Sequence, residues 1–158
     1  MKQVPLTQGY IAIVDDEDFE KIKHHKWSIT SNKEKTHVYA RAKIAGKTIK
    51  LHRYILGLTD KSMVVDHIDH NGLNNTRSNL RVCTLKENQA NQKPKKNAAS
   101  KYRGLAWNKQ RLKWQVSIKV NGVQKYLGIY KNEDEAARVY DKHAKIQYGE
   151  FAYLNFKD

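Results

Sequence analysis

The sequence has a single cysteine, two prolines and no long apolar run. The lone thiol, Cys83, cannot form an internal disulfide and leaves no cysteine cluster for zinc, which fits a reducing compartment. No N-terminal apolar segment is long enough for a signal peptide or a membrane span. We therefore expect an intracellular protein rather than a secreted or membrane-bound one.

Acidic residues are also scarce, and their absence is concentrated in one part of the chain. Thirty Lys and Arg face sixteen Asp and Glu, giving a formal charge of +14 and a pI near 9.8. Between Glu87 and Glu133 there is no acidic residue at all, while eleven Lys or Arg lie in that interval. A stretch of this kind favours contact with phosphates, so the pattern predicts a nucleic-acid partner.

The 158 residues allow one domain or two small ones, and the pattern changes near the middle of the chain. Residues 92–101 contain one proline, four lysines and no large apolar side chain, as a basic linker would. The same segment could also lie along a DNA backbone. We therefore predict a first domain over residues 1–91 and a second over residues 102–158.

The most informative stretch in the first part runs from residue 63 to residue 91. Apolar residues 63–65 predict a short strand that leads into Asp66, and Asn71-Gly72 is a turn signal. Residues 80–85 supply a second extended piece. Thr84, followed by Glu87 at capping-box spacing, predicts that a helix begins there. The expected local order is strand, loop, strand, helix.

Four polar side chains in this stretch suit one reaction. Asp66 offers a hard oxygen ligand of the kind that Mg2+ or Mn2+ prefers. His67 can accept a proton from water near neutral pH. Asn79, expected in the second strand, could fix the tautomer of that imidazole, and the amide oxygen of Asn88 could complete a metal site.

These residues, within VDHIDHNGLNNTRSNLRVCTLKENQAN, resemble the ββα-metal motif of HNH nucleases, and most of all HNH homing endonucleases of phages and mobile introns. The resemblance implies that His67 is the general base, that Asn79 orients it, and that Asp66 and Asn88 bind one divalent cation, Mg2+ or Mn2+. The last position is Asn88 where the family name has His, a variant found within the homing group. The implied setting is a bacterial or phage-infected cell.

Two other interpretations stay open at this point. Taken singly, an Asp-His pair is more often an exposed pair without a catalytic role, and Asn-rich segments are usually loops. Because Asn88 stands where the motif has His, the chain could instead be a sequence-specific DNA-binding regulator with an inactive HNH module. A basic RNA-binding or structural protein is the third possibility, because charge alone does not identify the nucleic acid.

The remainder of the first part predicts a small β-rich segment. Residues 11–14, 27–29, 38–44 and 48–51 read as strands, and the acids at 15–18 suit the start of a short helix better than a metal site. Helix-like spacing over residues 51–58 places Arg53 where its guanidinium could contact a phosphate, a weak candidate.

Strict alternation marks the second part. Trp114, Val116, Ile118 and Val120 alternate with polar residues, and Asn121-Gly122 is a favoured two-residue hairpin turn. A returning strand over 123–129, an earlier strand over 102–107 and a helix after Asn132 complete the pattern, with Gly149 at the helix end.

This second pattern resembles the AP2 DNA-binding domain, through its Tyr-Arg-Gly start, Leu127-Gly128, Ala136-Ala137, Tyr140-Asp141 and the terminal Leu-Asn-Phe. The resemblance implies three antiparallel strands that enter the major groove of duplex DNA, backed by one helix. Several family arginines are replaced here, so the base preference of plant relatives does not transfer. The DNA-contacting candidates are Arg103, Trp107, Lys109, Arg111, Gln115, Ser117, Lys119, Gln124 and Tyr126.

Together the two resemblances predict an α+β protein. Its N-terminal β-rich segment leads into a ββα-metal module, followed by a three-stranded antiparallel sheet with one helix. The predicted function is metal-dependent, site-directed cleavage of double-stranded DNA. One chain carries one such site, so either a monomer nicks one strand or a homodimer cuts both.

Overall fold

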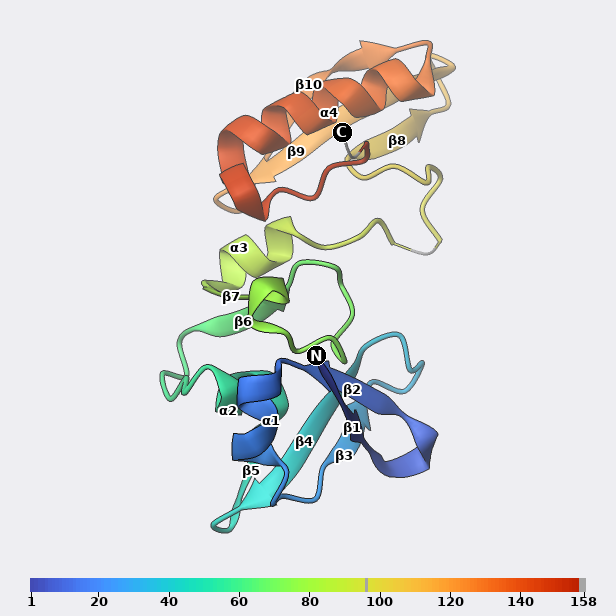
Figure 1. Ribbon diagram of the computed structural model, residues 1–158. Coiled ribbons are helices and arrows are strands. Elements are labelled where there is room, and N and C mark those ends of the chain that lie inside the picture. Colours follow the sequence, from blue (N-terminus) through green and yellow to red (C-terminus); the bar gives the residue numbers. More distant parts are fainter. Residues whose placement is uncertain (96, 157–158) are drawn as a thin grey trace. The chain divides into compact units, whose positions relative to one another are not determined.

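The computed structural model describes residues 1–95 and 97–156, so Lys96 of the predicted linker lies outside the described residues. The chain forms two compact units, Met1–Thr84 and Leu85–Asp158, each with its own core (Figure 1). The units combine small antiparallel sheets with a few helices, which confirms the predicted mixture of strands and helices.

Three small antiparallel sheets make up most of the first unit. The pairs are β1 with β2, β3–β4–β5 in sequence order, and β6 with β7. Their bounds are Lys2–Pro5 for β1, Ile11–Val14 for β2, Ser28–Ser31 for β3, Val38–Ile44 for β4, Lys47–Lys50 for β5, Val64–His67 for β6 and Leu80–Cys83 for β7. The short helical pieces are η1 (Thr7–Gly9), α1 (Asp16–Ile22), α2 (Leu51–Ile55) and η2 (Arg77–Asn79).

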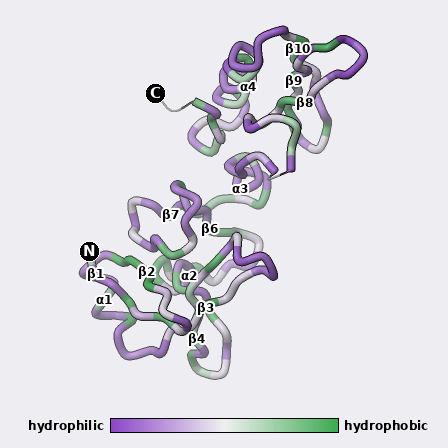
Figure 2. Tube along the Cα trace, turned by 90° about the vertical axis from the view of Figure 1, so that its right-hand side faces the viewer, coloured by the Kyte–Doolittle hydropathy of each residue, from purple (hydrophilic) through white to green (hydrophobic). Residues whose placement is uncertain are grey.

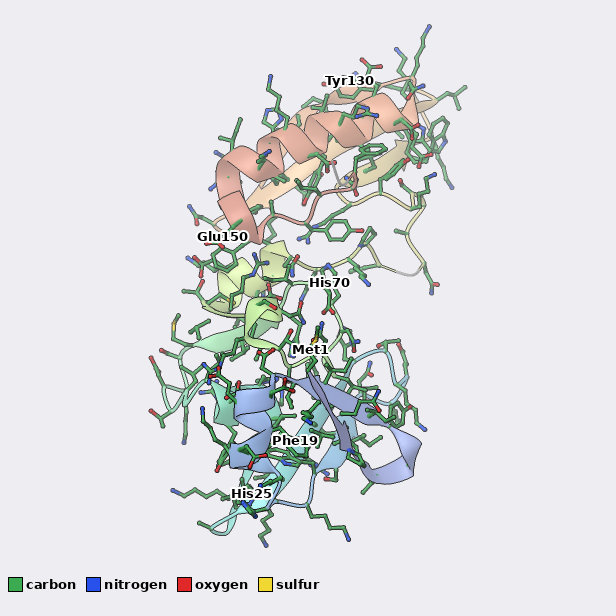
Figure 3. All side chains as sticks on the ribbon, viewed as in Figure 1. Met1, Phe19, His25, His70, Tyr130 and Glu150 are labelled. Atoms are coloured by element: carbon green, nitrogen blue, oxygen red, sulfur yellow. The ribbon has the colours of Figure 1, made fainter. Side chains whose placement is uncertain are left out.

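The core of the first unit forms because each short strand presents alternate residues inward. Along β2, Ala12 and Val14 are buried while Ile11 and Ile13 are more exposed, although the whole strand is hydrophobic in Figure 2. Phe19 of α1, labelled in Figure 3, packs against the same core. The core residues are Val4, Leu6, Ala12, Val14, Ile22, Trp27, Ile29, Ala40, Ala42, Leu51, Ile55 and Leu80.

The acids that precede Phe19 begin helix α1, as predicted. Asp16, Glu17 and Asp18 occupy its first turn, where carboxylates favour the positive end of the helix. The Asp15 carboxylate accepts the backbone N–H of Arg77 at 2.7 Å, and Asp18 binds the Arg77 side chain. These two acids therefore join the N-terminal segment to the loop that precedes β7.

The second unit contains a three-stranded antiparallel sheet in the order β10–β9–β8, with helix α4 against one face (Figure 1). The strands are β8 (Leu105–Asn108), β9 (Lys113–Val120) and β10 (Val123–Tyr130). The helical elements are α3 (Leu85–Ala90), α4 (Glu133–Tyr148) and η3 (Gly149–Phe151).

Local signals in the sequence set the boundaries of these elements. Asn121 and Gly122 both have positive φ, 50° and 85°, as the two-residue hairpin turn between β9 and β10 requires. Asn132 caps α4 by accepting the backbone N–H of Glu135 at 2.9 Å. The core under the sheet consists of Leu105, Val116, Ile118, Val120, Ala136, Ala137, Tyr140 and Ala144.

Helix α3 belongs to the second compact unit, whereas the sequence predicts it within the first domain, residues 1–91. The Arg103 guanidinium donates to the carbonyls of Gln89 and Ala90 at 2.8 and 2.7 Å, and also to that of Gln92. The backbone N–H of Tyr153 donates to the Ala90 carbonyl as well. These bonds satisfy the unpaired carbonyls at the end of α3, while the functional boundary at residue 91 stays a prediction.

The helices of this protein are short. None of them, over the described residues, has the length and apolar character that crossing a membrane would require.

Candidate active site

The β6–β7 hairpin carries the first two candidate residues at the end of its leading strand. Asp66 and His67 are the last two residues of β6, the strand that the apolar residues before them predict. In the register of the hairpin Asp66 lies opposite Arg81, and His67 lies opposite Leu80. Successive residues of a strand point to opposite faces, so the carboxylate and the imidazole leave the hairpin on different sides.

The imidazole of His67 is buried, with 5% of the residue exposed. The His52 ring lies edge-on to it, with the ring centroids 5.1 Å apart, and the Tyr39 ring lies at 5.8 Å. Burial lowers the pKa of His67 below its ordinary value, against the opposing effects of Asn75, Asp69 and Asp66. At neutral pH the ring is therefore uncharged, which is the state that can accept a proton.

The carboxylate of Asp66 is buried to the same extent and forms an ion pair within the hairpin. Its Oδ2 accepts hydrogen bonds from Nε and Nη2 of Arg81 at 2.9 and 2.7 Å. A buried carboxylate is tolerated because this guanidinium neutralises it. Asp66 thus places carboxylate oxygens one residue before His67 in the same strand.

Asn79 occupies a different position from the predicted one. It ends the 3-10 turn η2 just before β7, instead of lying inside the second strand. Its Oδ1 accepts the backbone N–H of Asp69 at 3.0 Å, and its Nδ2 donates to Asp69 Oδ1 at 2.9 Å and to the Asn74 carbonyl at 2.8 Å. Since these bonds use both ends of the amide, Asn79 holds the loop after β6 and is not the hydrogen-bond partner of the His67 ring.

The loop between β6 and β7 packs closely against strand β4. A Cβ added at Gly72 would lie 2.3 Å from the Val38 carbonyl oxygen and 2.6 Å from Cδ1 of Tyr39, so only glycine fits there. Asp69 ties the loop to itself by accepting hydrogen bonds from the Asn71 backbone and the Asn74 amide, each at 2.8 Å. The loop is therefore a fixed part of the site, and His70 within it is labelled in Figure 3.

Two residues that the sequence analysis did not select lie against the His67 ring. Asn75, with no exposed surface, places its Oδ1 3.4 Å from His67 Nε2. His52 of α2 is 5% exposed, and within the described part of the chain its Nδ1 has no hydrogen-bond partner. Their spacing in the sequence does not indicate a contact with His67. Asn75 is one of several asparagines in a predicted loop, and His52 belongs to a predicted short helix.

Arg53, the weak phosphate candidate, uses its guanidinium inside the first unit. Nη1 donates to the Met63 carbonyl at 2.8 Å and Nη2 to the Asp60 carbonyl. These bonds close the loop between α2 and β6. The positive charge remains near the β6 hairpin, but its clearest role is to fix the approach to that strand.

The residues that could hold a divalent cation are oxygen donors. Asp66 supplies a carboxylate in the first unit, and Asn88 is a partly exposed residue of α3 in the second. Over the described residues no group of three or more His, Cys, Asp or Glu could hold a metal. Carboxylate and amide oxygens are each ligand types that suit Mg2+ or Mn2+, which keep several waters and bind substrate phosphates.

The open face of the β8–β10 sheet carries most of the predicted DNA-contacting residues. Gln115, Ser117 and Lys119 of β9 lie on the face opposite the buried Val116 and Ile118. Gln124 pairs with Lys119 and Tyr126 with Ser117, so both extend the same face. The Gln124 amide donates to the Ser117 hydroxyl at 2.6 Å. Lys109 and Arg111 are exposed in the β8–β9 turn.

Two of the predicted DNA-contacting residues lie elsewhere. Trp107 pairs with Trp114, whose side of β9 faces helix α4, and the two rings meet edge-on with centroids 4.9 Å apart. Its ring therefore belongs to the helix side of the sheet, at an edge where it remains 39% exposed. The Arg103 guanidinium binds the end of α3 and so does not lie on the open face. Lys113, on the open face, was not selected.

Comparisons with known proteins bear on both units. A family model described as HNH endonuclease matches residues 51–90, from α2 through α3. A protein of Acanthamoeba polyphaga mimivirus, named "Uncharacterized HNH endonuclease L560", is 31% identical over 153 residues, which cover 94% of this chain and 76% of that protein. Protein 3.8 of Escherichia phage T7 is 40% identical over 68 residues, 43% of this chain and 56% of that protein. No solved structure gives a significant match.

Proposed function

The chain belongs to the HNH endonuclease family, and on that premise we propose that it cleaves double-stranded DNA with His67 as general base and one divalent cation. That it is a DNA endonuclease follows from the family. The observation that supports the finer mechanism is a buried imidazole at the end of β6, whose pKa is lowered by burial, directly after a buried carboxylate.

In the proposed reaction His67 takes a proton from a water molecule as the water oxygen attacks the phosphorus of the scissile phosphodiester. The bond from phosphorus to the leaving oxygen breaks, and that oxygen departs with the electron pair of the bond and is then protonated. The rings of His52 and Tyr39 limit the motion of the imidazole, so it stays aimed while the proton moves. A fixed base of suitable pKa typically contributes about 10²–10⁴ in rate.

HNH nucleases generally use a divalent metal ion. We propose Asp66 and Asn88 as its protein ligands, Asn88 on the strength of its spacing in the motif. When bound, the ion would stabilise negative charge on the phosphate and on the leaving oxygen. Arg81, which donates two hydrogen bonds to Oδ2 of Asp66, holds that carboxylate in place.

We propose that the second unit binds the duplex through the open face of its sheet, as an AP2-like domain would. Gln115, Ser117, Lys119, Gln124 and Tyr126 share that face, opposite to helix α4. Amide and hydroxyl groups can read base edges, and Lys119 can contact phosphate. Membership of the homing group would follow if the target site lies in DNA that lacks the gene for this protein.

Metal-dependent nicking of plasmid DNA tests this function. Purified protein is incubated with supercoiled plasmid in Mg2+ or Mn2+, with and without a chelator, and the nicked and linear products are quantified. We expect nicking that the chelator abolishes and added metal restores. Binding without cleavage in either metal would instead support the sequence-specific regulator with an inactive nuclease module.

A further inference from the structure

The contacts of Asn75 point to a role that the motif does not assign to it. Asn75 has no exposed surface, and its Oδ1 lies 3.4 Å from Nε2 of His67. The fully buried amide of an asparagine is costly unless its polar atoms are paired. Its placement against the base therefore reflects a specific contact.

The orientation of the Asn75 amide is fixed from its other end. Its Nδ2 lies 3.4 Å from the Gly72 carbonyl oxygen, which can only accept a hydrogen bond. Turning the amide over would place two oxygens together at Gly72, so the amide oxygen must face His67. An amide oxygen also only accepts, which requires that Nε2 of His67 carry the hydrogen.

The backbone of Asn75 is held by strand β2, far away in the sequence. Its N–H donates to the Ile13 carbonyl at 2.7 Å, and the Ile13 N–H donates to the Leu73 carbonyl at 2.8 Å. A parallel bridge pairs Ile13 with Asn74. The strand that anchors Asn75 thus lies outside residues 51–90, the part that matches the family model.

We propose that Asn75 is a positioning residue that holds His67 in the form protonated on Nε2, so that Nδ1 is the atom that accepts the proton from water. This inference rests on the proposed role of His67 as general base. The rings of His52 and Tyr39 restrict the imidazole by packing, whereas Asn75 determines which nitrogen carries the hydrogen.

The tautomer can be measured directly on the full-length protein labelled with 15N. Long-range 1H–15N correlation spectra distinguish the two neutral forms of histidine, and loss of one signal set in the His67→Ala variant assigns His67. We expect Nε2–H in the parent protein. A parent spectrum with the hydrogen on Nδ1 would overturn the proposal, whatever the activity.

Variants of Asn75 connect the tautomer to catalysis. In Asn75→Ala we expect a mixed tautomer and a single-turnover cleavage rate reduced by about 10–100-fold, with DNA affinity within about twofold of the parent. Asn75→Asp keeps an oxygen acceptor, so it should keep Nε2–H and recover most of the rate lost in Asn75→Ala. Asn32→Ala, in an exposed loop where the Asn32 side chain bonds to Thr36 and His37, is the matched control and should change neither measurement.

Three results would contradict the proposal: an unchanged tautomer in Asn75→Ala, an unchanged rate there, or a mixed tautomer in Asn75→Asp. If Asn75→Ala fails to fold, the parent spectrum and Asn75→Asp decide. If the parent cleaves no DNA in any metal, the proposed function fails, while the spectra still show whether Asn75 sets the tautomer.

Discussion

At the scale of single residues, His52 illustrates how the first unit excludes charge from its interior. Burial, followed by electrostatic interaction with His67, Lys50 and Arg53, lowers the pKa of His52 to about 3 from an ordinary value of 6.5. The folded protein therefore keeps this imidazole neutral across the pH range in which an unfolded chain would protonate it.

This neutral imidazole predicts a specific loss of stability in acid. Because the folded pKa lies below the unfolded one, its contribution is complete above pH 6.5 and declines as the pH falls toward 3. Between pH 6.5 and 5 we expect the parent to lose about 2 kcal/mol more free energy of unfolding than His52→Phe does. Denaturant unfolding over a pH series measures the difference.

An exposed histidine gives the matched control for that series. His143 lies on the exposed side of α4, and His143→Ala should follow the parent curve. Parallel curves for the parent and His52→Phe would show that His52 is not the source of the acid sensitivity.

Sequence spacing was informative for some residues of the candidate site and misleading for others. Asp66 and His67 adjoin in the sequence, so their placement at one strand end follows from the strand alone. The partner of His67 could not be chosen among several asparagines of one loop, because that choice depends on how the loop packs on β2 and β4. The structure places Asn75 at the ring and uses Asn79 to hold the loop.

At the scale of secondary-structure elements, one ion pair connects α1 to the turn before β7. Asp18 has no exposed surface and accepts hydrogen bonds from Nε and Nη2 of Arg77, each at 2.8 Å. Burial alone would raise the pKa of Asp18, but the hydrogen bonds from Arg77 and Lys21 outweigh it and lower the pKa. The pair thereby attaches an N-terminal helix to the loop of the candidate site.

Removing the charge of Asp18 should loosen this attachment. We expect Asp18→Asn to lower the free energy of unfolding by about 2–3 kcal/mol at neutral pH, less than the 3–5 kcal/mol typical of a fully buried pair. The reason for the smaller figure is that the Arg77 side chain is 40% exposed and can regain water. Chemical denaturation at pH 7 measures the change.

The control for Asp18 lies on the same helix. Glu20 pairs with Lys23 at the surface, and surface pairs contribute little, so Glu20→Gln should leave the free energy of unfolding nearly unchanged. Equal effects of the two substitutions would show that the ion pair with Arg77 does not stabilise the loop.

Alternation and turn chemistry predicted the elements of the second unit because both act over a few residues. The hairpin of β9 and β10 and the cap at Asn132 appear where the sequence indicated. Arg103 was assigned to the DNA-contacting face from the resemblance alone. Its long side chain instead reaches the free carbonyls of α3, a contact that no local pattern reveals.

At the scale of the whole molecule, the charge of +14 predicts DNA binding that weakens as salt rises. The open sheet face and helix α4 both carry lysines, but only the sheet face is proposed to contact DNA. Lys119→Gln should therefore reduce the slope of log affinity against log salt by about 0.9, the value for one phosphate contact. Fluorescence anisotropy with a duplex at several salt concentrations gives the slope.

Helix α4 supplies the comparison for that experiment. Lys142 lies on its exposed surface, on the other side of the sheet, and Lys142→Gln removes the same charge. We expect it to leave the slope nearly unchanged. Equal slopes for the two variants would mean that a lysine on either side of the sheet contributes equally to the salt dependence of DNA binding. That result would contradict the open sheet face as the DNA-binding surface.

The chain has two compact units, which meet between Thr84 and Leu85. The basic segment over residues 92–101 predicts a boundary after residue 91, and that functional boundary stays a prediction. The break falls before α3 because Arg103 and Tyr153, both distant in sequence, bind the last carbonyls of that helix. Such long-range hydrogen bonds depend on the folded second unit and leave no mark in the spacing of the motif.

The central claim is that His67 removes the proton during DNA cleavage, and single-turnover kinetics of His67→Ala test it most directly. With metal and enzyme in excess over plasmid, we expect the cleavage rate to fall by about 10²–10⁴ while the dissociation constant for DNA stays within about twofold. His24→Ala, at an exposed position after α1, should match the parent. Cleavage by His67→Ala at the parental rate would contradict the assignment of His67 as the general base.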